Sequence, residues 1–156
     1  MSWTHLHLLL NHVPVLGTIF GLLLLGVAMI IKSAELKKAS LGIFIITALA
    51  TIPVYLTGNS AEDTVEHLPA VAESIIDQHQ EWALISLVTV GVLGLFATGG
   101  LLVARRLRAF PTWIVTTTLI FSLVVGGLMA WTANLGGQIR HTEIRSESQF
   151  LPPSDD

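Results

Sequence analysis

Residues 82–104 read WALISLVTVGVLGLFATGGLLVA, an uncharged apolar run that Arg105 and Arg106 close. A helix needs about 20 such residues to cross the hydrocarbon core of a bilayer. Three further uncharged apolar runs occur at 8–31, 39–56 and 112–133. The sequence therefore predicts an all-α membrane protein, a bundle of four transmembrane helices.

The overall composition agrees with this interpretation. The chain has 156 residues, of which 52% are hydrophobic and 12% are charged, and a soluble domain of this size would need more polar surface. The net charge of -3 argues against nucleic acid as a partner. Cysteine is absent, which excludes disulfides, iron–sulfur clusters and haem attached through a C-x-x-C-H motif.

The segments between the runs predict one membrane domain at 1–145 and a polar C-terminal tail at 146–156. The helical spacing of apolar residues that begins at Ala70 leads without a break into the third run, which predicts one long helix ending near Arg108. No internal repeat is apparent in the sequence.

Turn-forming residues predict where the second and fourth helices end. We expect Thr57-Gly58-Asn59 to close the second helix, and Ser60 to begin a short outer helical segment, 60–81, that caps the bundle. We expect Asn134 and Gly136-Gly137 to close the fourth helix, because glycine and asparagine are common helix terminators.

The distribution of basic residues predicts the orientation. The connections after the first and third runs carry six of them, whereas the other side carries only Arg140 and Arg145; the six are Lys32, Lys37, Lys38, Arg105, Arg106 and Arg108. Basic loops stay on the cytoplasmic side. Both termini should therefore be extracytoplasmic, in the inner (cytoplasmic) membrane of a bacterium.

All histidines fall in segments expected on the outer side: His5, His7, His12, His67, His79 and His141. Imidazole binds metals and haem and exchanges protons near neutral pH, so imidazoles gathered at one face predict a site there. At a rise of about 1.5 Å per residue, His7 lies roughly 37 Å from Lys32, and His79 lies roughly 39 Å from Arg105. His7 and His79 thus share one height, as the two ligands of a bis-imidazole haem must.

Other ligand sets stay open at this point. His12 could pair with His141 or with His67, and Arg140 could neutralise a haem propionate. Copper or zinc could instead be held by a set of four imidazoles: His7, His12, His79 and His141. We expect His5 to be an ordinary interfacial side chain.

Acidic residues flank His67 and His79 in the outer segment: Glu62, Asp63, Glu66, Glu73, Asp77 and Glu81. They lack the Glu-x-x-His pairs of a di-iron site and fit a solvated helix face. Such a face could also dock a basic partner such as a soluble cytochrome. Phosphate-loop, nucleophile-elbow and His-Glu-x-x-His motifs are absent, which favours an electron-transfer or accessory subunit over a stand-alone enzyme.

Four His-bearing segments follow one another along the chain: His7-Leu-Leu-Leu-Asn-His12-Val-Pro14, Gly58-Asn-x-Ala-Glu62-Asp-x-Val-Glu66-His67-Leu-Pro69, Asp77-x-His79 and Gly136-Gly-x-Ile-Arg140-His141-x-Glu143. Together they resemble a family of small bacterial four-helix integral membrane proteins defined only as a domain of unknown function. The resemblance covers the chain to about Arg145. It implies the four-helix topology and assigns the histidines other than His5 to the family's motifs, but it implies no activity.

Two functional hypotheses follow. The first is a membrane electron-transfer protein that binds b-type haem, or another metal, at the outer face and links a quinol or membrane partner to an outside acceptor. The second is a cofactor-free accessory subunit that packs against larger membrane subunits or against copies of itself. Gly17-x-x-x-Gly21 would allow close helix approach in such an assembly.

Overall fold

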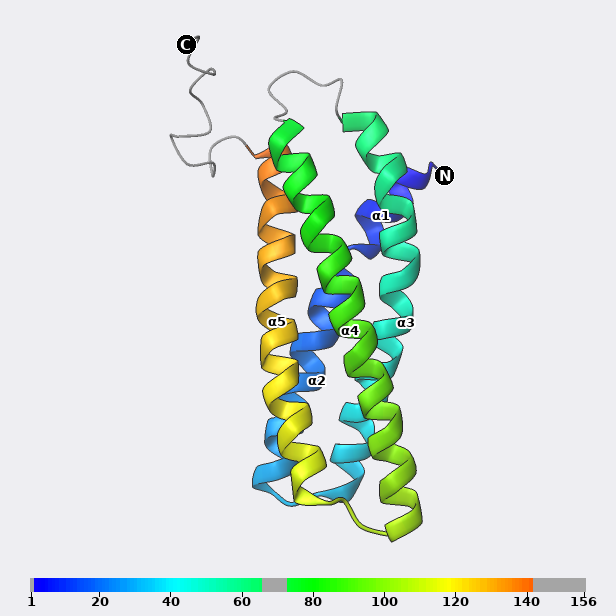
Figure 1. Ribbon diagram of the computed structural model, residues 1–156, viewed down its shortest axis with the longest axis vertical. Coiled ribbons are helices and arrows are strands. Elements are labelled where there is room, and N and C mark those ends of the chain that lie inside the picture. Colours follow the sequence, from blue (N-terminus) through cyan, green and yellow to red (C-terminus); the bar gives the residue numbers. More distant parts are fainter. Residues whose placement is uncertain (1, 66–72, 142–156) are drawn as a thin grey trace.

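The computed structural model describes residues 2–65 and 73–141. These residues form α1 (Trp3–Leu10), α2 (His12–Ile30), α3 (Ala34–Val65), α4 (Glu73–Leu107) and α5 (Thr112–Arg140). Four helical units, namely α1 with α2, α3, α4 and α5, are long and apolar enough to cross a membrane. They lie side by side, with the connections 31–33 and 108–111 at one end and the start of α1 at the other (Figure 1). The predicted all-α fold with four helices of membrane-spanning length is confirmed.

The first span contains an interruption that the apolar pattern did not predict. α1 ends at Leu10 and α2 begins at His12, with Asn11 between them. Pro14 explains the break, because a proline ring has no N–H and clashes with the carbonyl of the residue four positions earlier, here Leu10. α1 packs mainly against α3 (Figure 1).

The predicted end of the second helix is wrong. α3 continues through Thr57-Gly58-Asn59 to Val65, so Ser60 lies inside a helix and caps nothing. The segment expected at 60–81 is therefore the end of α3 followed by the start of α4, and residues 66–72 lie outside the described part.

The predicted end of the fourth helix is also wrong, because α5 continues through Asn134 and Gly136-Gly137 to Arg140. None of the described glycines has a positive φ, so none terminates a helix in the left-handed conformation. A glycine inside a helix costs only about 1 kcal/mol relative to alanine. Gly58 and Gly136 instead leave room for imidazoles of neighbouring helices, as described below.

Glycines bring α2 and α3 close together. Gly17 faces Thr47, and a Cβ built on Gly21 would lie 2.6 Å from Cε1 of Phe44. Ser40 donates a hydrogen bond from α3 to the Gly21 carbonyl at 2.7 Å. The Gly17 and Gly21 pair therefore serves packing within this chain. The core around it consists of Leu25, Leu41, Phe44, Val90, Leu93, Ala97, Val115, Val125 and Met129.

The burial pattern repeats between the two halves of the molecule. Thr112 opens α5 78 residues after Ala34 opens α3. Buried positions recur with this offset: Ser40 and Thr118, Phe44 and Ser122, Thr47 and Val125, Thr51 and Met129. Buried positions of α2 recur in α4 at an offset of 76: Pro14 and Val90, Thr18 and Gly94, Gly21 and Ala97, Ala28 and Ala104. The two hairpins, α2–α3 and α4–α5, thus bury largely corresponding faces; the exceptions are Leu25 and Leu41, whose counterparts Leu101 and Leu119 are only partly buried.

Candidate functional site

His7 of α1 is held against α3. Its Nδ1 lies 2.9 Å from the carbonyl oxygen of Val54 and 3.3 Å from Thr57 Oγ1. A carbonyl oxygen only accepts hydrogen bonds, so Nδ1 carries the proton, and Nε2 of the neutral ring keeps its lone pair. The main chain of α3 therefore fixes both the orientation and the tautomer of this imidazole.

His79 of α4 is held against α5 in the same way. Its Nδ1 lies 3.0 Å from the carbonyl oxygen of Thr132, which again assigns the proton to Nδ1 and leaves Nε2 with its lone pair. Thr132 Oγ1 lies 2.9 Å from Ser86 Oγ and donates to the Leu128 carbonyl at 3.0 Å. This hydroxyl pair ties α4 to α5 beside the ring, which is half-buried.

The two contacts occupy corresponding positions in the repeat. Val54 and Thr132 each lie 20 residues after the first residue of their helix. Gly58 lies four residues after Val54, and Gly136 lies four residues after Thr132. Each glycine faces the imidazole that the preceding carbonyl holds. The nearest His7 atom lies 3.7 Å from a Cβ built on Gly58, and the nearest His79 atom lies 3.0 Å from one built on Gly136. Both hairpins therefore hold an imidazole by the same device.

The two imidazoles belong to different helices, α1 and α4. A positive charge on His7 would repel a positive charge on His79. Helix rise predicts a common height for the two rings. Each ring has used Nδ1 on a carbonyl, so its Nε2 is the ring nitrogen left to bind an electron-pair acceptor.

Asn11 adds a polar atom on the same face of the helix as His7. The backbone N–H of Asn11 donates a hydrogen bond to the His7 carbonyl at 2.9 Å, so the two side chains are neighbours one helical turn apart. Within the described residues, Asn11 Oδ1 is the buried side-chain atom that lacks a hydrogen-bond partner. An open buried acceptor costs about 1–3 kcal/mol. Its position next to His7 indicates a site that a bound group or water completes.

The other predicted ligands are not gathered with this pair. His5, His12 and His141 are exposed. His67 lies outside the described residues, and so does the side chain of Arg140. The four-histidine set considered for copper or zinc is thus divided between a half-buried pair, His7 and His79, and an exposed pair, His12 and His141.

The predicted helix end at Gly136-Gly137 does not exist, and His141 directly follows the last turn of α5. In residues 2–65 and 73–141, no three His, Cys, Asp or Glu side chains form a group that could hold a metal ion.

The acidic residues that the structure describes fit a solvated face. Glu73, Asp77 and Glu81 are exposed on the first turns of α4. The side chains of Glu62 and Asp63, and the whole of Glu66, lie outside the described part.

Sequence reasoning missed the groups that orient the two rings. The carbonyls of Val54 and Thr132 could not be singled out, because every residue carries one. The signal that could have pointed to them is the matching position of Gly58 and Gly136, each 24 residues after the start of its helix.

Comparison of the chain with protein-family models, with curated proteins and with solved structures found no significant match. The chemistry of the site therefore rests on its geometry. That geometry consists of two imidazoles near one end of the helices, each fixed through Nδ1 by a main-chain carbonyl of a neighbouring helix.

Proposed function

We propose that this protein is a membrane electron-transfer protein that holds one b-type haem between His7 and His79. The observation that carries the proposal is that the two imidazoles are held alike, each tied through Nδ1 to a main-chain carbonyl of a neighbouring helix. Histidines that ligate metals commonly donate their other ring N–H in this way, which fixes the tautomer and makes the ligating nitrogen more basic.

The residues present fit a haem better than a bare copper or zinc ion. A porphyrin brings its own ring nitrogens, so two imidazoles would suffice to hold it, whereas a zinc site takes most of its ligands from protein side chains. The chain contains no cysteine, so the haem would be held without covalent attachment. When bound, haem supplies one-electron chemistry at its iron.

The chain's own residues divide the remaining tasks. His7 would bind from α1 and His79 from α4, and the carbonyls of Val54 and Thr132 would keep both rings in the required tautomer. Asn11 Oδ1 would accept a hydrogen bond within the site. Arg140 is the cation we propose for a carboxylate substituent of the haem.

The same proposal places the four long helices as a transmembrane bundle in the inner membrane of a bacterium. The strongly basic connections would face the cytoplasm, and both termini, the histidines, the end of α3 and the start of α4 would face outside. Large apolar side chains on the outside of the helices support contact with lipid, since Phe20, Ile46 and Leu95 are 62%, 66% and 76% exposed. Electrons would pass from a quinol or membrane partner to an outside acceptor such as a soluble cytochrome, docked at the exposed acids of α4.

Absorption spectroscopy of the purified protein tests this proposal. Protein from haem-replete cells should show a Soret band and, after reduction, a narrow α-band. Because the two imidazoles are held equivalently, His7→Ala and His79→Ala should each abolish the spectrum or change it to the same degree. His5→Ala and His12→Ala are matched controls, since both residues lie near the same end but are exposed.

Two results would contradict the proposal. One is colourless protein under haem-replete conditions, which would favour the cofactor-free accessory subunit. The other is a haem spectrum that His12→Ala changes as strongly as His79→Ala does, which would place the ligands elsewhere.

A further inference from the structure

A cavity of about 540 Å³ lies at the opposite end of the molecule from the histidines. It opens between the start of α3, the end of α4 and the connection that follows α4. Its wall combines three basic side chains, Lys38, Arg105 and Arg108, with an apolar surface formed by Leu101, Ala104 and Phe110. No part of the proposed haem site reaches this cavity.

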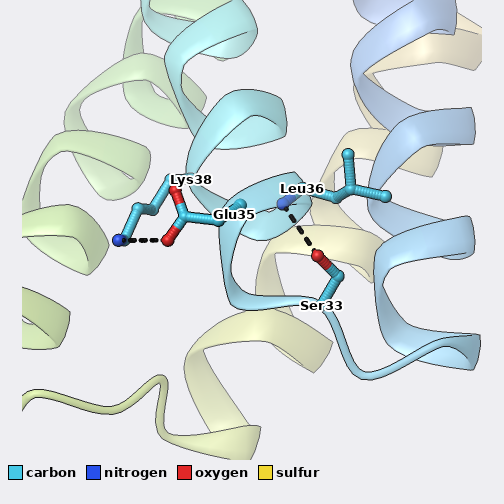
Figure 2. Close-up of polar contacts among 4 residues, drawn as sticks. All are labelled: Ser33, Glu35, Leu36 and Lys38. Carbon is cyan, nitrogen blue, oxygen red and sulfur yellow. Dashed lines mark hydrogen bonds and ion pairs between the residues drawn. The ribbon is translucent and has the colours of Figure 1, made fainter.

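The positive charge around the cavity is only partly neutralised. Lys38 forms an exposed ion pair with Glu35 at 2.7 Å on the first turn of α3, where Ser33 accepts a hydrogen bond from the Leu36 N–H (Figure 2). This is the one ion pair among the described residues, so Arg105 and Arg108 have no carboxylate partner there. Glu35 is also the only acidic residue in the stretches 1–61 and 82–142. The cavity therefore keeps two guanidinium groups that can bind an anion.

The backbone at Arg108 supports a role for its side chain. Arg108 follows the last residue of α4 and has a φ of 52°, the left-handed conformation that closes a helix. Glycine is the usual residue there, since other residues pay about 1–3 kcal/mol in this conformation. The chain nevertheless places a guanidinium at this position, where it lines the cavity.

The cavity has the two chemical features of a phospholipid site. Guanidinium groups bind phosphate oxygens in a bidentate manner. Arg105 directly follows the apolar run, so it lies at the height where lipid headgroups begin. Leu101 and Phe110 offer an apolar surface that a free anion would not use but an acyl chain would cover.

We propose that this inner cavity binds the phosphate headgroup of an anionic phospholipid through Arg105 and Arg108, with an acyl chain along Leu101 and Phe110. Arg106 provides a matched control, because it is adjacent, exposed and equally charged, yet does not line the cavity. Arg108→Gly removes the guanidinium while suiting the left-handed backbone, so the variant should fold at least as well as the natural chain.

Native mass spectrometry of the full-length protein in a neutral detergent, titrated with phosphatidylglycerol or phosphatidylcholine, tests the proposal. The natural chain should bind one phosphatidylglycerol more tightly than phosphatidylcholine. Arg108→Gly should weaken that binding roughly fivefold, and the double variant Arg105→Gln with Arg108→Gly roughly thirtyfold. Arg106→Gln should leave it unchanged, and circular dichroism should show the same helicity in every variant.

Three outcomes would overturn the proposal. Equal weakening by Arg106→Gln would show a diffuse surface charge effect instead of a site. Equal affinity for phosphatidylcholine would show an apolar groove that ignores the phosphate charge. Displacement of the lipid by inorganic phosphate at millimolar concentration would show a free-anion site.

Discussion

Replacing Gly136 with alanine tests whether the His79 imidazole is held between α4 and α5 as described. An alanine Cβ would lie 3.0 Å from Cε1 and 3.4 Å from Nδ1 of His79, so the ring must move and its contact with the Thr132 carbonyl must lengthen. Two other glycines provide graded controls. A Cβ on Gly58 would lie 3.7 Å from His7, an ordinary contact, and a Cβ on Gly127 would meet nothing within 4 Å.

The expected magnitudes follow from these distances. Alanine in place of a helical glycine gains roughly 0.5–1 kcal/mol, and this gain should appear in full at Gly127 and Gly58. At Gly136, weakening of the His79 hydrogen bond should remove about 1 kcal/mol, so the net change should be near zero.

Reversible unfolding in mixed micelles measures these free energies, and NMR of the imidazole Nδ1–H reports on the His79 contact. The Nδ1–H resonance of His79 should shift in Gly136→Ala and stay in place in the two control variants. Equal stabilisation at all three positions, with an unchanged His79 resonance, would refute the proposed position of the ring.

Three further predictions concern packing and orientation. Gly21→Ala should lower the free energy of unfolding by roughly 1–3 kcal/mol, because its Cβ would lie 2.6 Å from the Phe44 ring. Gly26→Ala, which meets open space, is its control, and an equal loss there would contradict the described α2–α3 interface. Phe44→Ala should lower the free energy of unfolding by about 3 kcal/mol in the same assay. This is the low end for a buried phenylalanine, because in a membrane lipid surrounds the helices even when they are separated. A loss below about 1 kcal/mol would contradict the place of Phe44 in the core. Because the chain lacks cysteine, single introduced cysteines can report the orientation in the membrane. A membrane-impermeant maleimide should label Gln78→Cys in intact cells but Arg106→Cys only after permeabilisation. The reverse labelling pattern would contradict the proposed topology.

The spans were predictable because the bilayer leaves the backbone few choices. Within hydrocarbon every main-chain N–H and C=O must be satisfied, so an uncharged apolar run of sufficient length has to be helical. The helix ends were less predictable, because they depend on contacts. Gly58 and Gly136 have the local character of terminators, yet each lies inside a helix and faces an imidazole of a neighbouring helix.

The sequence predicts a common height for the candidate ligands but not their hydrogen-bond partners. Helix rise predicts that His7 and His79 lie at one level. It could not show which ring faces another helix: His7 lies against α3 and His12 is exposed, with the helix interrupted at Asn11 between them. That interruption follows from Pro14, whose effect on the preceding turn the hydropathy pattern conceals. The carbonyl partners and the internal repeat depend on tertiary packing, which a single sequence does not display.

The measurement that tests the central claim most directly is the electron paramagnetic resonance spectrum of the oxidised protein, purified from haem-replete membranes. If the Nε2 atoms of His7 and His79 hold one iron from two sides, the natural chain should give a low-spin bis-imidazole spectrum, and His79→Ala should convert it to a high-spin spectrum or remove it. A protein without any haem signal, or a low-spin signal that survives in both His7→Ala and His79→Ala, would contradict the account.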